Sequence, residues 1–124
     1  MNAETFARLA SGDTPKGDVL AAARIAGIMA AKRTSELIPL CHIVSLTRVE
    51  IAIALDAGMA IIHATAEARD RTGVEMEALV AASTAALTIY DMLKAIDRTM
   101  SFDVCLLEKS GGRSGDFRRD ESDQ

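Results

Sequence analysis

The stretch that decides the fold is Thr72-Gly-Val-Glu-Met-Glu-Ala-Leu-Val-Ala-Ala-Ser-Thr-Ala-Ala-Leu-Thr-Ile-Tyr-Asp-Met-Leu-Lys94. It is rich in residues that favour helices and contains no proline, so it predicts one long helix over residues 74–96. Many of its side chains are small, which lets a neighbouring backbone or a ligand approach closely. Acids stand near both ends, where packing alone does not require them. The helix is therefore a candidate carrier of chemistry as well as a structural element.

The sequence around this helix predicts an α+β domain. In chain order, the expected elements are a helix over 18–37, strands over 44–55 and 59–69, the helix over 74–96 and a strand over 102–107. Pro39 ends the first helix, and a hairpin turn at 56–58 joins the first two strands. The order α-β-β-α-β lacks only a first strand to match the ferredoxin-like pattern β-α-β-β-α-β.

Alternation along the two central strands predicts a sheet with one buried face. In the first strand the apolar set is Leu46, Val49, Ile51, Ile53 and Leu55. In the second strand Ile61, His63, Thr65 and Glu67 share one face.

The remaining segments are shorter and more polar. Residues 1–15 form a lead that holds a helical turn or two, and 16–117 form the main domain. Within that domain, 70–73 is expected to be a loop and 109–115 a basic, glycine-rich loop. Residues 118–124 are expected to be a loose polar tail.

Composition narrows the class of protein. The chain has 124 residues and a net charge of -4, without a Lys/Arg run, which argues against a nucleic-acid-binding protein. Residues 19–31 are apolar but contain Arg24 and are too short to cross a bilayer. Cys41 and Cys105 have no CxxC spacing, and reduced thiols are typical of the cytoplasm. We therefore expect a cytoplasmic protein that binds neither nucleic acid nor a membrane.

Four polar side chains of the long helix fall within a narrow arc: Glu77, Thr84, Thr88 and Asp91. Lys94 lies three residues beyond Asp91, so these two can touch. The plain interpretation is a solvated stripe with an ordinary ion pair, and the alternative is a functional surface. Glu77 and Asp91 lie roughly 21 Å apart along the axis, so one small reacting centre cannot contact both. If both are functional, sites at the interfaces of an oligomer are favoured.

Three further groups of residues are candidates for chemistry. His42 follows Cys41, but a lone His beside a Cys is more often structural, and nothing at suitable spacing completes a zinc site. Lys16 stands before a helix N-terminus, which attracts anions. The loop from Lys109 to Arg113 offers cations and backbone N–H groups, a composition typical of phosphate binding. Lys16 and the loop from Lys109 to Arg113 together indicate an anionic substrate.

The motifs taken together resemble the MoaC family. They are Lys16-Gly-Asp-Val, Ala26-Gly-Ile-Met-Ala-Ala-Lys-Arg-Thr34, Leu37-Ile-Pro-Leu-Cys-His42, Thr72-Gly-Val-Glu-Met-Glu-Ala-Leu79, Ala85-Ala-Leu-Thr-Ile-Tyr-Asp-Met92 and Lys109-Ser-Gly-Gly-Arg-Ser-Gly-Asp-Phe117. The resemblance covers residues 16–117 in collinear order. Any one motif is modest evidence, whereas six in order are highly specific.

The resemblance implies a ferredoxin-like subunit of a homohexamer, a trimer of dimers with active sites at subunit interfaces. Family members are cyclic pyranopterin monophosphate synthases of molybdenum cofactor biosynthesis. These lyases convert 3′,8-cyclo-7,8-dihydro-GTP into cyclic pyranopterin monophosphate and release pyrophosphate. The implied catalytic residues are Asp91, Lys94 and Lys16. The implied substrate-binding residues are Leu40, Cys41, His42, Glu75, Met76, Glu77 and Lys109. No cofactor or protein-held metal is expected, and Mg²⁺ accompanying the triphosphate is compatible with the sequence.

The chain also departs from the family pattern. Family members usually begin with a Met-Val-Asp-Val-Ser-like strand and a basic stretch whose Lys and Arg serve the active site, and we expect that first strand to be missing or shortened here. Ile43 stands where a proline is usual, and Arg113 where a lysine is usual. Arg113 keeps the charge but not the ability to transfer a proton. The alternative to an active synthase is a MoaC-like module that binds or assembles without catalysis because it lacks this segment.

Overall fold

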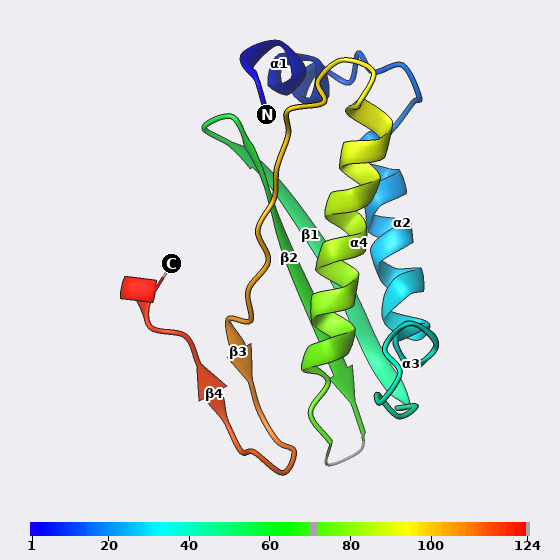
Figure 1. Cartoon of the computed structure of the whole chain (residues 1–124), viewed down its shortest axis with the longest axis vertical. Coiled ribbons are helices and arrows are strands. Elements are labelled where there is room, and N and C mark those ends of the chain that lie inside the picture. The colour runs from blue at the N-terminus through cyan, green and yellow to red at the C-terminus, as the bar shows by residue number, and fades with distance from the viewer. Residues whose placement is uncertain (70–71, 124) are drawn as a thin grey trace.

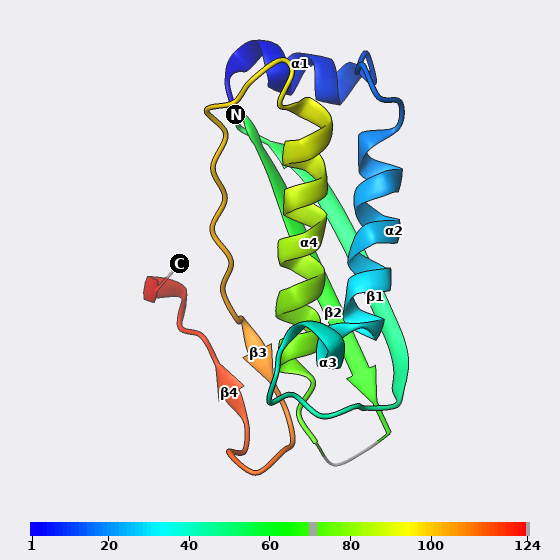
Figure 2. The ribbon, with the colours of Figure 1, turned by 45° about the vertical axis from the view of Figure 1, so that its right-hand side comes forward.

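The computed structural model describes residues 1–69 and 72–123. Its elements are α1 (Ala3–Ser11), α2 (Val19–Lys32), α3 (Thr34–Leu37), β1 (Leu46–Asp56), β2 (Met59–Ala68), α4 (Glu75–Leu93), β3 (Glu108–Lys109), β4 (Phe117–Arg118) and a 3₁₀ turn, η1 (Glu121–Asp123). Helices α2 and α4 lie side by side on one face of the β1–β2 hairpin, and α1 crosses one end of this layer (Figures 1 and 2). The predicted α+β class is confirmed, and α2–β1–β2–α4 forms the central part of a ferredoxin-like arrangement.

The β1–β2 hairpin has one face turned toward the helices and one toward solvent. Ile51 is buried, and its neighbours on that face, Val49 and Ile53, are partly buried. A register irregularity between Leu46 and Arg48 explains why the apolar positions change from even to odd numbers early in β1. The predicted common face of Ile61, His63, Thr65 and Glu67 is confirmed, and it is the exposed face.

Helices α2 and α4 approach closely because small residues fill their interface. Ala23 of α2 and Ala81 and Ala85 of α4 are fully buried there. At Gly27 a Cβ atom would lie 3.0 Å from the carbonyl oxygen of Ala81 and 3.1 Å from Cδ1 of Ile51. The predicted role of small side chains in close packing is thus observed between two helices of one chain.

The end of α4 is tied to the start of the chain. The carboxylate of Asp97, just beyond α4, accepts a hydrogen bond from the backbone N–H of Asn2 (2.9 Å). It also accepts one from the backbone N–H of Thr99 (2.9 Å). The Asn2 side chain in turn caps α1 by accepting from the N–H of Thr5 (2.9 Å). This buried carboxylate fixes α1 across the end of the helical layer.

The prediction of one continuous helix over 18–37 is wrong. Its start is sound, because Asp18 caps α2 by accepting from the N–H of Ala21 (3.0 Å). The helix is interrupted at Arg33, and the buried hydroxyl of Thr34 donates to the carbonyl oxygen of Ala31 (2.9 Å). A side-chain hydroxyl that donates to a carbonyl oxygen of the preceding helical turn competes with the backbone N–H for that acceptor, and the helix ends there. The chain continues as the short helix α3.

The predicted strand over 102–107 is also wrong. These residues are extended in Figure 1 but join no sheet, and β3 begins only at Glu108. Strand propensity reflects packing against neighbours, and this segment pairs with no strand among the described residues. Instead β3 pairs with β4, so part of the tail expected to be loose is ordered. Of the predicted loop over 70–73, Asp70 and Arg71 lie outside the described residues.

By length and composition alone, α4 also qualifies as a membrane-crossing helix. A core helix passes the same test, and one side of α4 packs against α2 through Ala81 and Ala85. The composition of α4 is therefore accounted for by its place in the fold.

Candidate active site

The first cluster of candidate functional side chains lies at the C-terminal end of α4. Lys94 Nζ donates to Asp91 Oδ1 at 2.5 Å, and Lys16 Nζ lies 3.5 Å from Asp91 Oδ2. Helices α2 and α4 run in opposite directions, so the loop before α2 brings Lys16 to the end of α4. All three predicted catalytic residues therefore meet, although their positions in the sequence are far apart.

This cluster holds its acid in the ionised form. The hydrogen bond from Lys94 and the charge of Lys16 lower the pKa of Asp91 below its ordinary value. The side chain of Asp91 is 57% exposed, so an approaching molecule can reach it. An exposed carboxylate between two ammonium groups can accept or relay protons, and the ammonium groups can bind an anion.

The second candidate region is a cavity of about 780 Å³ at the N-terminal end of α4. All seven predicted substrate-binding residues line it, and they come from the α3–β1 loop, from the first turn of α4 and from β3. Its lining residues are Ile38, Leu40, Cys41, His42, Val44, Thr72, Gly73, Glu75, Met76, Glu77, Lys109, Gly112, Arg113 and Ser114. The structure thus brings these predicted residues into one site.

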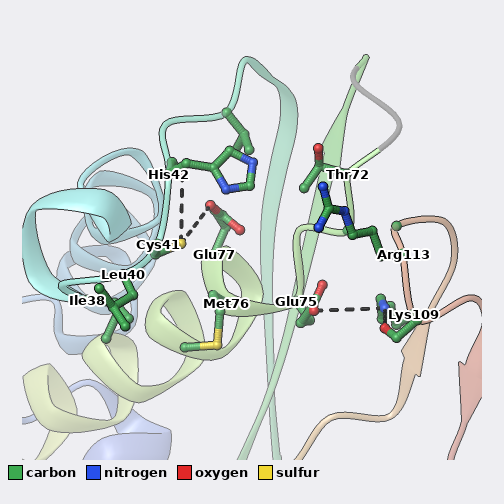
Figure 3. Close-up of a pocket in the computed structure, with 14 residues that line it drawn as sticks. Ile38, Leu40, Cys41, His42, Thr72, Glu75, Met76, Glu77, Lys109 and Arg113 are labelled. Carbon is green, nitrogen blue, oxygen red and sulfur yellow. Dashed lines mark hydrogen bonds and ion pairs between the residues drawn. The ribbon is translucent and has the colours of Figure 1, made fainter.

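One wall of this cavity carries a thiol beside a buried carboxylate. Glu77 is only 3% exposed, and Cys41 Sγ lies 3.9 Å from its Oε1 (Figure 3). Burial and the negative charge of Glu77 raise the pKa of the Cys41 thiol, so the thiol stays protonated and can donate. The interpretation of the helix arc as a solvated stripe is wrong for Glu77. The position of Glu77 on a helical wheel could not reveal that it is buried, because the α3–β1 loop covers this end of α4.

The opposite wall carries the cations. Lys109 Nζ lies 3.9 Å from Glu75 Oε1 and donates to Ser114 Oγ. The Lys109 side chain is only 7% exposed, so its ammonium group is held in a fixed position. Oε2 of Glu75 is buried without a hydrogen-bond partner, which leaves an acceptor near the cavity. In Figure 3, Glu77 points toward Cys41 and His42, whereas Glu75 faces Lys109.

Two glycines hold the β3–β4 loop against the start of α4. Gly112 has a φ of 79°, and a Cβ atom there would lie 2.9 Å from the backbone N of Gly73. A Cβ on Gly73 would clash with the side chains of Glu75 and Lys109. Sequence reasoning did not find this contact, since glycine in a basic loop has many uses. The contact sets the distance between the two walls.

Thr72, Ser114, Ile38 and Val44 also line the cavity and were not predicted. Thr72, Ser114 and Ile38 stand inside motifs that carry the family resemblance, which is the signal that the sequence offers for them, whereas Val44 stands outside these motifs. Within residues 1–69 and 72–123, no group of three His, Cys, Asp or Glu side chains lies close enough together to hold a metal ion.

The two regions are separated by the length of α4. Glu75 and Asp91 lie on its first and last turns, about 24 Å apart along the axis. The fold and the site together define a small α+β enzyme with an acid–lysine cluster and a separate polar cavity, suited to an anionic small molecule.

Comparison with known proteins gives the particular family. The model described as "MoaC family" matches residues 1–112. Cyclic pyranopterin monophosphate synthase of Roseiflexus sp. (strain RS-1) is 61% identical over 123 residues, covering 97% of this chain and 78% of the relative. The synthase of Chloroflexus aggregans is 58% identical over 125 residues (98% and 76%), and that of Heliobacterium modesticaldum is 56% identical over 128 residues (98% and 78%). The chain belongs to the MoaC family.

Proposed function

We propose that this protein is a cyclic pyranopterin monophosphate synthase of molybdenum cofactor biosynthesis. It converts 3′,8-cyclo-7,8-dihydro-GTP into cyclic pyranopterin monophosphate and pyrophosphate. Its similarity to synthases along nearly the whole chain supports this proposal. The observation that carries it is the grouping of the family-matched residues, with the binding set around one cavity and the acid–base set around Asp91.

The cavity is suited to a nucleotide-like molecule. Lys109 and Arg113 are the cations that face phosphate oxygens, and charge-assisted hydrogen bonds to phosphate are strong. The N-terminus of α4 opens at the cavity without a side-chain cap, so its N–H groups add a favourable field for an anion. The carboxylates of Glu75 and Glu77 accept hydrogen bonds from N–H groups of the base. Leu40 and Met76 supply apolar contact.

The Asp91 cluster serves proton transfer. The reaction opens and closes C–N bonds, and a hydroxyl must attack the α-phosphorus as pyrophosphate leaves. Each of these steps moves a proton. Asp91 accepts protons, and Lys94 and Lys16 donate them or stabilise developing negative charge.

A complete site needs both ends of α4, and one reacting centre cannot span about 24 Å. We therefore propose that the Asp91 cluster of one copy completes the cavity of another, within a homohexamer built as a trimer of dimers. Closed symmetric assemblies of this kind are common. The protein is expected to be soluble and cytoplasmic. We expect no resident cofactor, and Mg²⁺ accompanying the triphosphate is compatible with this proposal.

The direct test supplies the cyclic dihydro-GTP substrate to the purified protein and measures the pterin product and pyrophosphate. The proposal expects both products in equal amounts. Binding of the substrate by the folded oligomer without either product would contradict it and would favour a non-catalytic binding module.

A further inference from the structure

The ammonium group of Lys109 lies between two possible partners on one wall of the cavity. It donates a hydrogen bond to Ser114 Oγ, and it lies 3.9 Å from Glu75 Oε1, which is beyond hydrogen-bond reach. Figure 3 shows Glu75 and Lys109 facing each other across this gap. The ammonium group is therefore bonded to an uncharged hydroxyl, although a carboxylate lies beside it.

Electrostatics alone would favour the opposite arrangement. The side chain of Lys109 is only 7% exposed, and the attraction between opposite charges grows as water is excluded. A lysine stem is flexible, so the ammonium group could move into a direct hydrogen bond with Glu75. Oε2 of Glu75 is also buried without a hydrogen-bond partner, so this carboxylate has an acceptor to offer. A separate contact must therefore hold the ammonium group in place.

Ser114 belongs to a loop with two internal closures. The backbone N–H of Gly115 donates to the carbonyl oxygen of Gly112 (3.3 Å), which closes a four-residue turn that contains Ser114. The carboxylate of Asp116 accepts from the backbone N–H of Gly111 (3.0 Å), which closes the wider loop. The hydroxyl of Ser114 is thus presented from a fixed backbone.

The stem of Lys109 is confined by the two glycines that join the loop to the start of α4. A Cβ atom on Gly73 would lie 2.7 Å from Lys109 Cε. A Cβ atom on Gly112 would lie 3.5 Å from Lys109 Nζ. The glycines therefore leave room for the stem, and the bond to Ser114 sets the position of the ammonium group at its end.

We propose that Ser114 is a positioning residue that holds the Lys109 ammonium group away from Glu75, so that both charged groups stay available to a phosphorylated substrate. An ammonium group has three N–H donors, and the bond to Ser114 uses one of them. The other two can donate to phosphate oxygens in the cavity. A closed Lys109–Glu75 pair would neutralise the cation and occupy the acceptor that Glu75 offers. This inference rests on the proposed function, since it takes the substrate to be phosphorylated.

Ser114→Ala tests this role through the binding of inorganic pyrophosphate, measured by calorimetry. The dissociation constant should rise about tenfold, in line with the loss of a hydrogen bond to a charged group. Ser114→Thr keeps a hydroxyl and should stay within about threefold of the parent. Ser101→Ala removes an exposed serine hydroxyl outside the cavity and should leave binding unchanged.

The effect of Ser114→Ala should depend on Glu75. In a Glu75→Gln background no carboxylate attracts the ammonium group, so Ser114→Ala should raise the dissociation constant by less than about threefold. With the cyclic dihydro-GTP substrate, Ser114→Ala should raise KM more than it lowers kcat, because it changes binding rather than proton transfer.

An equal rise in both backgrounds would overturn the proposal, since Ser114 would then support the loop without keeping Lys109 away from Glu75. The proposal would also fail if Ser114→Ala had no effect, if Ser114→Thr lost as much affinity, or if the parent did not bind pyrophosphate. Pyrophosphate binding requires no turnover. An inactive protein that shows the expected binding pattern would therefore contradict the proposed function alone.

Discussion

At the scale of single residues, the proposed chemistry centres on Asp91. Its carboxylate lies between Lys94 and Lys16, is exposed to solvent, and has a lowered pKa because of these two cations. An exposed ion pair contributes little to stability, so packing does not account for three charged groups meeting at one helix end. The proposed proton transfer would account for this grouping of charges.

Asp91→Asn is therefore expected to lower kcat by roughly 10²- to 10⁴-fold, the usual contribution of a positioned acid or base. The variant should unfold within a few degrees of the parent, because the lost ion pair is on the surface. Steady-state assays and thermal unfolding measure the two quantities. Glu4→Gln, on the exposed side of α1, is the control and should keep the parent rate. A normal kcat in Asp91→Asn would remove Asp91 from the mechanism.

The titration of Asp91 tests the cause of its lowered pKa. Lys94→Ala removes the largest contribution, so the pKa should rise toward the ordinary value of about 3.9, whereas Lys94→Arg should keep it low. Carboxyl ¹³C NMR across the acid range measures this midpoint. Because the folded pKa is lowered, the small stabilisation from Asp91 is present above the unfolded pKa and is lost as pH falls through the folded pKa. An unchanged midpoint in Lys94→Ala would show that Lys94 does not hold the acid.

At this scale the sequence predicted which residues belong to the candidate site. It did not predict how deeply each of them is buried. The motifs predicted Glu77 and Lys109, whereas their burial arises from the loops that fold over the start of α4. The meeting of Gly73 and Gly112 depends on two segments distant in sequence, and neither shows a local signal for it.

At the scale of secondary structure, local pattern predicted those elements whose partners are close in sequence. The β1–β2 hairpin and α4 were predicted with ends within a few residues, because period and turn chemistry act locally. The strand over 102–107 was wrong because a strand needs a neighbour. The break at Arg33 was missed because it depends on a hydrogen bond of the Thr34 side chain.

A substitution at Gly27 tests how closely α2 packs against α4 and β1. Gly27→Ala is expected to destabilise the protein by about 1–3 kcal/mol, because the new methyl group meets the backbone oxygen of Ala81, which cannot move alone. Helix propensity by itself predicts the opposite sign, by about 1 kcal/mol. Denaturant unfolding measures the change. Ala22→Gly, on a less buried side of α2, is the control for propensity and should destabilise by about 1 kcal/mol. A stabilised Gly27→Ala would contradict the close packing.

Alanine substitutions at two glycines test whether the position of the β3–β4 loop shapes the cavity. Gly112 and Gly115 both have positive φ values, 79° and 71°, so alanine is strained at either. Only Gly112 approaches Gly73, whereas a Cβ on Gly115 meets nothing within 4 Å. Gly112→Ala should raise KM by roughly tenfold, equivalent to about 1.4 kcal/mol of binding, and Gly115→Ala should raise it much less. Equal effects of the two substitutions on KM would show that the glycine contact does not shape the cavity.

At the scale of the whole molecule, the account depends on the separation of the cavity from the Asp91 cluster. The sequence predicted the residues of the cavity and those of the Asp91 cluster. It also predicted that the length of the helix separates them. The fold adds that no loop of the described chain brings them together, since α4 runs straight between them (Figures 1 and 2). The proposed site, in which the cavity of one copy meets the Asp91 cluster of another, uses both ends of α4.

Subunit complementation tests this claim most directly. Asp91→Asn and Lys109→Ala, each inactive alone, are unfolded together, refolded as a mixture and assayed with the cyclic dihydro-GTP substrate. If sites combine the cavity of one copy with the Asp91 cluster of another, random mixing of equal amounts should restore about a quarter of the parent activity. A mixture of Asp91→Asn and Lys94→Ala should restore none, because both changes lie in the same cluster. If the first mixture is no more active than its separate components, the site is not shared between copies.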